Sequence, residues 1–208
     1  MARKASHAIS YRLTKFETIA GWLYLPFYLL ILNLLLQLAN EKFSLGMTAL
    51  TMNIVYFAVN LLAVLLIFHG FLRQSFFGGS FWNFVQALVL GFAMYYAGTW
   101  AIQALERLLA GQFTIYNNET LNDLIFENRY VMLAVSVVFA PVIEETLVRG
   151  VVFGTIRPAS RVLAYIVSAL LFTLMHNWQY FGLHPFLSIL LSCLPYIPAS
   201  VALAWVYE

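Results

Sequence analysis

Charged residues are scarce in this chain. Only 10% of its 208 residues are charged, whereas 62% are hydrophobic. A soluble domain has about 45–50% apolar and about 25% charged residues. So few polar side chains cannot cover a water-exposed surface, and most of the surface must therefore contact lipid. The composition excludes an ordinary soluble enzyme and predicts an integral membrane protein.

Cysteines and processing signals are also scarce. Cys193 is the single cysteine, which excludes an intrachain disulfide and the paired spacing of a zinc knuckle. The N-terminal stretch MARKASHAISYRLTKFE is basic and polar, and no small-residue cleavage site follows the first apolar run. We therefore expect this run to stay in the protein as a membrane span. The low charge and single cysteine fit a bacterial inner membrane.

Long apolar runs dominate the rest of the sequence. A helix needs about 20 residues to cross the hydrocarbon core of a bilayer. We expect six spans, at residues 21–39, 45–68, 81–104, 131–154, 162–175 (extending to 178 or 180) and 185–206. The predicted fold is all-α, a multi-pass bundle of about six membrane helices in a single integral domain over residues 1–208.

The connections between the spans differ in charge, which predicts an orientation. Residues 1–18 are rich in lysine and arginine, and Arg73, Arg157 and Arg161 lie in connections on the same side. The positive-inside rule then places the N-terminus in the cytoplasm of a multi-pass cell-membrane protein. Residues 105–129, acidic on balance, become an extracytoplasmic segment. Its apolar residues suggest a helix along the interface, namely Leu105, Leu108, Leu109 and Phe113.

Three ionisable groups interrupt the fourth span, in the stretch PVIEETLVRG. A charge at bilayer depth costs at least about 2.5–3.5 kcal/mol, so such residues usually serve a function. Glu145 and Arg149 are four residues apart and share a helix face, which lets them pair. Glu144 points elsewhere and needs another partner. Two adjacent carboxylates in a low dielectric resist being charged together, which favours a role for one of them as a general base.

The partner expected for Glu144 is His176, on the next span. The connection TIRPASR is short, so the two spans should be antiparallel neighbours. Counting from this turn gives the two residues similar depths, and the pair could then hold one water molecule. Pro141 is expected to kink or restart the helix; a restart would place Glu144 in a first turn, where the helix dipole favours an anion.

Other interpretations of these residues stay open. The Glu–Arg pair could be a structural clamp between helices, and His176 could be an interfacial residue beside Asn177 and Trp178. A proton-coupled transporter also uses intramembrane charges, but a broken helix at a charge occurs only in the second half of this chain. A third alternative is an immunity or scaffold protein that binds a peptide partner without cutting it.

Serine, cysteine and metal mechanisms find little support. The sequence has no G-x-S-x-G and no H-E-x-x-H, and Cys193 lies in an apolar span as a packing residue. An oxygen-rich site with one histidine is a poor zinc site. We therefore expect no metal and no other cofactor.

At these residues the chain resembles the CPBP family of intramembrane proteases. This family includes the CAAX-type prenyl-protein endopeptidases and the bacteriocin-processing or self-immunity (ABI) proteins. Its motif E-E-x-x-x-R corresponds to Glu144, Glu145 and Arg149, and its motif F-x-x-x-H to Phe172 and His176. The two motifs follow in order on consecutive spans, and the resemblance covers about residues 130–208.

The resemblance implies glutamate-dependent hydrolysis of a peptide bond at the membrane. Glu144 would activate water as a general base, His176 would help to hold the water, and Glu145 with Arg149 would support and orient the site. We expect the site to face the cytoplasmic half of the bilayer. The implied substrate is a membrane-associated peptide, such as a prenylated protein tail or a bacteriocin leader. The partners are this substrate and membrane lipids, with no nucleic acid.

A third family motif, H-x-x-x-N or H-x-x-x-D, supplies oxyanion stabilisation from a later helix. The histidine that follows His176 is His184, and Ser188 stands four positions further on. We therefore expect the chain to be truncated before this motif.

Overall fold

The structure, a computed structural model, describes residues 13–77, 80–108 and 114–208. In these ranges the secondary structure is helical, apart from one isolated bridge between Phe181 and His184. The elements up to the third span are α1 (Lys15–Pro26), η1 (Phe27–Ile31), α2 (Leu32–Phe43), α3 (Ala49–Ile67), α4 (His69–Phe77) and α5 (Phe81–Leu108). Then follow α6 (Tyr116–Glu127), α7 (Arg129–Ala134), η2 (Val135–Phe139), α8 (Ala140–Glu144), η3 (Glu145–Phe153), α9 (Gly154–Ile156), α10 (Arg161–Asn177), η4 (Trp178–Tyr180), α11 (Phe186–Cys193) and α12 (Tyr196–Tyr207).

Six helical stretches are long and apolar enough to cross a membrane. They are Lys15–Phe43, Ala49–Ile67, Phe81–Leu108, Arg129–Ile156, Arg161–Tyr180 and Phe186–Tyr207. Each overlaps one of the predicted apolar runs, so the all-α, multi-pass fold predicted from the sequence is confirmed. The fifth span reaches Tyr180 through the short helix η4, as its sequence suggested.

The segment between the third and fourth spans differs from the prediction. Leu105 and Leu108 belong to the spanning helix α5, not to a separate interfacial helix. The chain stays helical there because leucine, glutamate and arginine are all strong helix formers. Leu109 and Phe113 lie outside the described residues. The separate helix in this segment is α6, which begins later, at Tyr116.

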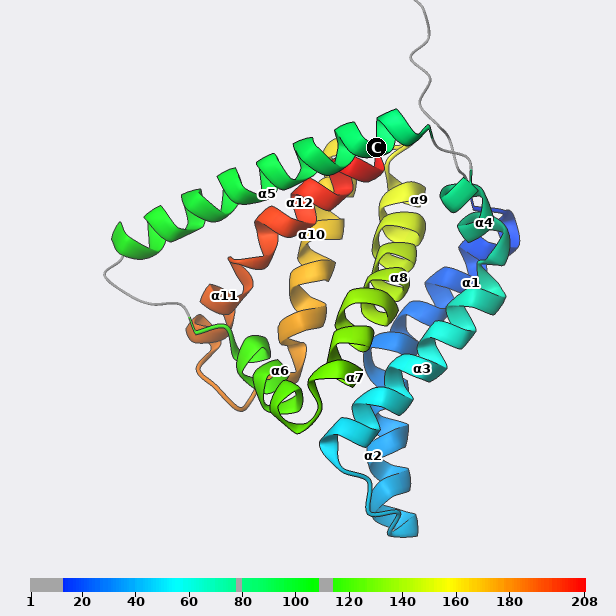
Figure 1. The fold of residues 1–208 in the computed structure, drawn as a ribbon, viewed down its shortest axis with the longest axis vertical. Helices are drawn as coiled ribbons and strands as arrows, with labels where there is room; N and C mark the ends of the chain where they lie inside the picture. The colour runs from blue at the N-terminus through cyan, green and yellow to red at the C-terminus, as the bar shows by residue number, and fades with distance from the viewer. Residues whose placement is uncertain (1–12, 78–79, 109–113) are drawn as a thin grey trace, which may run out of the picture.

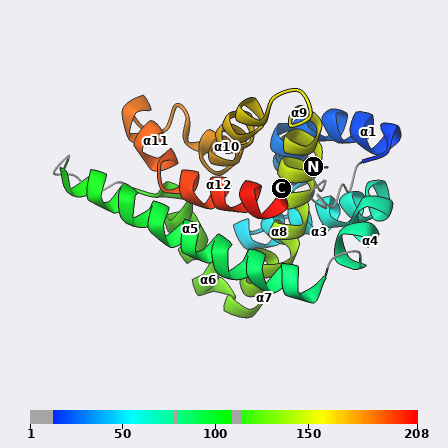
Figure 2. The same ribbon diagram turned by 90° about the horizontal axis from the view of Figure 1, so that it is seen from above.

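The helices lie side by side, with the third span and the first two spans on opposite sides of the bundle (Figure 1). α5 lies along one edge with α12 beside it, and α10 packs on the other side of α12. The span from α7 to α9 follows, and α1 and α3 lie beyond it, as the view from above also shows (Figure 2). The main apolar core lies between these last spans and includes Val64, Phe68, Ile143, Leu147 and Val151.

The two ends of the bundle carry different elements (Figure 1). α6 and the turn between α2 and α3 lie at one end, which we call the α6 end. The start of α1, α4 and the end of α12 lie at the other. We call this the basic end, because it carries Lys15, Arg73, Arg157 and Arg161.

Capping side chains fix where several helices begin. Thr14 and Glu17 form a capping box at the start of α1: the Glu17 backbone N–H donates to the Thr14 hydroxyl at 3.2 Å, and the Thr14 backbone N–H donates to the Glu17 carboxylate at 2.8 Å. The same carboxylate accepts a hydrogen bond from the backbone N–H of Phe71 at 3.0 Å. Glu17 therefore joins α1 to α4 at the basic end.

Glycines allow α5 to pack closely against α12. A Cβ atom added at Gly98 would lie 2.7 Å from the Cβ of Pro198, and one added at Gly91 would lie 2.6 Å from a methyl group of Val206. Small residues allow such close approach between membrane helices. The sequence of the third span thus carries information about its partner, although both helices are apolar around most of their surface.

The substitution Gly98→Leu should separate α5 from α12. The rigid ring of Pro198 cannot move aside, and overpacking typically costs about 1–3 kcal/mol. We expect a lower midpoint in a detergent unfolding titration. Ala97→Val is the matched control, because Ala97 is exposed on the same helix. Equal stability of the two variants would contradict this packing.

Glu208 joins the end of α12 to the start of α10. Its carboxylate accepts hydrogen bonds from Arg157 at 2.6 Å, Arg161 at 2.9 Å and Tyr165 at 2.9 Å. Partial burial raises the pKa of Glu208, but these hydrogen bonds outweigh it, so the net pKa lies below its usual value. A carboxylate with a lowered pKa in the folded state stabilises the fold above its unfolded pKa, and this stabilisation is lost as the pH falls through the folded value.

The substitution Glu208→Gln should therefore destabilise the protein in a pH-dependent way. Arg157 and Arg161 are exposed, so we expect a loss of about 0.2–1 kcal/mol at neutral pH. The difference from the unmodified chain should shrink as the pH falls below about 4. Unfolding titrations at several pH values measure this effect, with the exposed Glu119→Gln as control. A loss that stays constant with pH would argue against the carboxylate as its source.

Candidate active site

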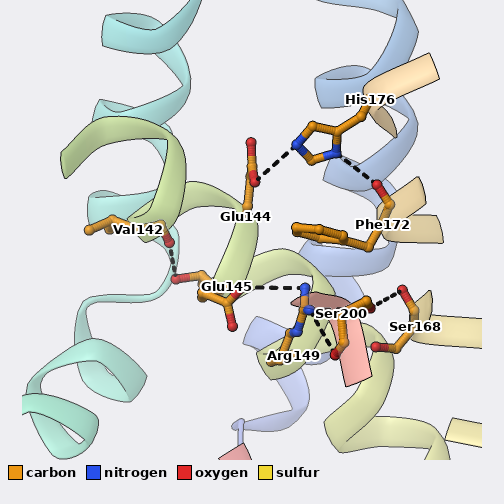
Figure 3. Close-up of polar contacts among 9 residues, drawn as sticks. Val142, Glu144, Glu145, Arg149, Ser168, Phe172, His176 and Ser200 are labelled. Atoms are coloured by element: carbon orange, nitrogen blue, oxygen red, sulfur yellow. Dashed lines mark hydrogen bonds and ion pairs between the residues drawn. The ribbon is translucent and has the colours of Figure 1, made fainter. Parts of the chain in front are cut away.

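Glu144 and His176 face each other across two neighbouring spans (Figure 3). Glu144 is the last residue of α8, and His176 lies in the last turn of α10. The Oε2 atom of Glu144 lies 3.9 Å from the Nε2 atom of His176, and both side chains are largely buried. The proximity predicted from the short connection between the spans is therefore confirmed.

The hydrogen bond at the other ring nitrogen fixes the tautomer of His176. Its Nδ1 atom lies 2.8 Å from the carbonyl oxygen of Phe172, which can only accept a hydrogen bond. In the neutral ring, Nδ1 then carries the hydrogen and Nε2 presents a lone pair toward Glu144. At 3.9 Å the two groups are too far apart for a direct hydrogen bond. This spacing leaves room for one water molecule that donates a hydrogen bond to the Glu144 carboxylate and another to Nε2 of His176.

Glu145 pairs with Arg149, as predicted from their spacing. The Oε1 atom of Glu145 lies 3.3 Å from Nη1 of Arg149 (Figure 3). The Arg149 side chain is 0% exposed, whereas that of Glu145 is 35% exposed. Glu145 thus reaches the edge of the site, and Arg149 lies wholly inside the protein.

Two other helices complete the surroundings of Arg149. Its Nη2 atom donates to the carbonyl oxygen of Ser200 at 3.1 Å and to the Ser200 hydroxyl at 3.2 Å. The guanidinium carbon lies 4.5 Å from the ring centre of Phe172, a cation–π contact. Phe172 therefore does more than pack, because the same residue supports Arg149 with its ring and His176 with its carbonyl group.

The helix does not restart at Pro141, which corrects the prediction of a free helix start before Glu144. The span Arg129–Ile156 is one continuous helix with two π-helical stretches, η2 before the proline and η3 after Glu144. There the backbone N–H of Ala140 donates to the carbonyl of Val135. Widening of the helix before Pro141 accommodates its missing N–H, as single-turn π-bulges do in other helices. A helix dipole at a free N-terminus therefore does not act on Glu144.

A cavity of about 490 Å³ lies beside Glu144 and His176. Tyr28, Tyr56 and Pro141 are among the residues that line it. Much of the wall comes from α2, the start of α3, α6, α7, η2 and η4. These elements meet at the α6 end of the bundle (Figure 1). The cavity therefore leads from the site towards the α6 end.

This direction brings two predictions from the sequence into conflict. The positive-inside rule predicts that the basic end is cytoplasmic. The site was also predicted to face the cytoplasmic half of the bilayer, so a cavity at the site would be expected to lead towards the basic end. The cavity beside Glu144 leads away from the basic end. If the basic end is cytoplasmic, the site is reached from the other side.

Several residues around the site were not predicted from the sequence. Ser200 holds Arg149, and the ring of Tyr196 lies 4.5 Å from the ring of His176. Five carboxamide side chains line the cavity, namely Asn33, Gln37, Asn53, Asn117 and Gln179. Polar residues inside apolar spans were a usable signal for Asn53 and Ser200, because such residues are costly in a bilayer unless they have a partner.

The described part of the chain contains no set of ligands for a metal ion. There, no three His, Cys, Asp or Glu side chains come together in a way that could hold a metal ion. Glu144 and His176 approach each other without a third such side chain. The expectation of a metal-free site remains a prediction.

The fold and the site together define the class of protein: a helical membrane protein with an intramembrane Glu–His pair. A family model for the type II CAAX prenyl endopeptidases, Rce1-like, matches residues 126–208. This match supports the assignment of this region to the CAAX protease family, which the two motifs predicted. The matched region includes both motifs and the last three spans. No curated protein and no solved structure matches the chain significantly.

Proposed function

We propose that the protein is an intramembrane endopeptidase in which Glu144 activates water. The observation that carries this proposal is the pairing of Glu144 and His176 at 3.9 Å beside a cavity, within a region that a protease-family model matches. The substrate is a membrane-associated peptide, such as a prenylated protein tail or a bacteriocin leader.

The proposed reaction needs one water molecule between the two side chains. Glu144 takes a proton from the water while Nε2 of His176 accepts its second hydrogen and orients it. The oxygen of the water then attacks the carbonyl carbon of the scissile peptide bond. When the carbon–nitrogen bond breaks, the proton held by Glu144 passes to the leaving amine. The products are a carboxylic acid and an amine, and Glu144 is ready for another cycle.

Glu145 and Arg149 act on this reaction by positioning the other groups. Arg149 contacts Glu145, Ser200 and Phe172, which belong to three different helices. The carbonyl oxygen of Phe172 also accepts the hydrogen bond from His176. A shift of Arg149 would therefore move Phe172, and with it the imidazole ring of His176 that faces Glu144. Catalytic groups need supporting contacts of this kind, since small displacements from the productive geometry reduce the rate strongly.

The experiment that tests the function compares cleavage, binding and transport. The full chain in lipid nanodiscs is incubated with farnesylated and unmodified peptides, and released fragments are identified by mass spectrometry. Hydrolysis that is lost in Glu144→Gln supports the protease. Peptide binding without cleavage by the unmodified chain would support a scaffold, and ion-coupled flux into vesicles would support a transporter. Neither alternative gains support from the family match.

A further inference from the structure

Two contacts within α10 hold the imidazole ring of His176 (Figure 3). Nδ1 donates to the carbonyl oxygen of Phe172 at 2.8 Å, and the centre of the Phe172 ring lies 4.7 Å from the centre of the imidazole. The hydrogen bond fixes the position of Nδ1, but the ring can still tilt about this point. Such a tilt moves Nε2 away from Glu144. A contact from another helix would limit it.

Tyr196 makes such a contact from α12. The centre of its ring lies 4.5 Å from the centre of the His176 ring, and the two ring planes are inclined by 31°. Ring centres about 4.5–7 Å apart are typical of an attractive aromatic pair. The described residues that line the cavity include His176 but not Tyr196. Tyr196 therefore acts on the imidazole and not on an occupant of the cavity.

The backbone around Tyr196 is stiff enough to hold its ring in place. Pro195 and Pro198 flank it, and each proline ring fixes one backbone angle. Pro195 is the N-cap of α12, and Pro198 lies in the first turn, where a backbone N–H would have no partner inside the helix. Pro198 also packs closely on Gly98 of α5. The ring of Tyr196 is thus presented by a rigid helix start that a neighbouring span supports.

The same face of α12 carries the partner of Arg149. Ser200 follows Tyr196 by four residues, so both side chains lie on one side of the helix. Ser200 accepts two hydrogen bonds from Arg149, at 3.1 Å and 3.2 Å. One helix face therefore contacts a group from each of the two motifs, and a residue on it can position the site without touching a substrate.

We propose that Tyr196 is a positioning residue, which holds the imidazole of His176 with Nε2 towards Glu144. The consequence for hydrolysis rests on the proposed function, whereas the orientation of the imidazole does not. The contact is made by the aromatic ring. Phenylalanine should therefore replace Tyr196 without loss, and an aliphatic side chain should not.

The tautomer of His176 tests this orientation without any hydrolysis. The full chain, with isotope-labelled histidine, is reconstituted in lipid and studied by nitrogen NMR at a pH where the ring is neutral. The signals of His176 are identified by their loss in His176→Gln. We expect separate signals for a protonated Nδ1 and an unprotonated Nε2 in the unmodified chain and in Tyr196→Phe. In Tyr196→Leu the two signals should approach each other, because a ring that can turn loses the hydrogen bond that fixes its tautomer.

Steady-state kinetics of the same variants test the effect on hydrolysis. A displacement of about 1 Å can reduce the rate about 10²-fold, so kcat of Tyr196→Leu should fall by up to this factor. KM should change little, because Tyr196 does not line the cavity. Tyr196→Phe should retain nearly all of its kcat. Tyr96→Leu, at an exposed tyrosine of α5, is the matched control and should leave both constants unchanged.

Three results would overturn the proposal. Separate nitrogen signals in Tyr196→Leu, as in the unmodified chain, would show that Tyr196 is not needed to hold the ring. An unchanged kcat in this variant would show that the contact has no effect on hydrolysis. A loss in Tyr196→Phe equal to that in Tyr196→Leu would assign the effect to the hydroxyl group. Tyr196→Met, with its flexible side chain, repeats both measurements in case Tyr196→Leu does not fold.

A failure of the proposed function can be told apart from these results. If the unmodified chain hydrolyses no peptide, or if Glu144→Gln remains fully active, the proposed function is lost. The nitrogen signals then still decide whether Tyr196 holds the imidazole of His176.

Discussion

Replacing Glu144 with glutamine should reduce kcat for peptide hydrolysis by about 10²–10⁴-fold, the usual contribution of a general base. Glutamine keeps the shape of the side chain but cannot take a proton from water. Because the substrate itself loses no contact, KM should change little. Steady-state kinetics of the full chain in nanodiscs, with a peptide found to be cleaved, measures both constants.

Glu145→Gln is the matched control for this prediction. The two glutamates are adjacent, but only Glu144 lines the cavity, whereas Glu145 faces Arg149. The control should retain much more of its kcat than Glu144→Gln, since Glu145 acts on the reaction only by positioning other groups. If Glu145→Gln were the more damaging of the two, the roles proposed for the glutamates would have to be exchanged.

The motif residues were predictable from the sequence because their chemistry is out of place there. Charges inside an apolar run are costly, so Glu144, Glu145 and Arg149 stand out without any structure. The four-residue spacing gave the Glu145–Arg149 pair, and the short connection at Arg157 gave the antiparallel neighbour that carries His176. Both inferences depend on local geometry, which a sequence specifies well.

The arrangement of the spans around the site was less predictable. Membrane helices are apolar on several faces, so periodicity does not tell which face meets which neighbour. The contact of Ser200 with Arg149 joins residues that are 51 positions apart. The cavity likewise depends on α6 and the α2–α3 turn lying at the same end. These features result from long-range packing, and so the direction in which the cavity leads could not be predicted from the sequence.

Pro141 shows a different kind of limit. The sequence correctly identified a missing backbone donor in the fourth span, but a helix can accommodate it by a restart, a kink or a local widening. The structure contains the widening, as the π-helical turn from Val135 to Phe139. The choice depends on how tightly neighbouring helices hold the span, which no local pattern records.

Removing the charge of Arg149 should have the largest effect on folding. Arg149→Met keeps much of the volume but loses the contacts with Glu145, Ser200 and Phe172. Breaking a buried ion pair typically costs about 3–5 kcal/mol, and the partial exposure of Glu145 favours the lower end of this range. An unfolding titration in detergent measures the loss. Arg157→Met, at an exposed position, is the control and should cost less than about 1 kcal/mol.

Two further variants separate the contributions of charge and shape at this position. Arg149→Lys keeps the charge but lacks the planar fork that reaches Ser200 and stacks on Phe172, so it should remain clearly less stable than the unmodified chain. Adding Glu145→Gln to Arg149→Met removes the unpaired carboxylate and should restore part of the lost stability. If the lysine variant were fully stable, charge alone would explain the contribution of Arg149 to stability, and its contacts with Ser200 and Phe172 would not be needed for folding.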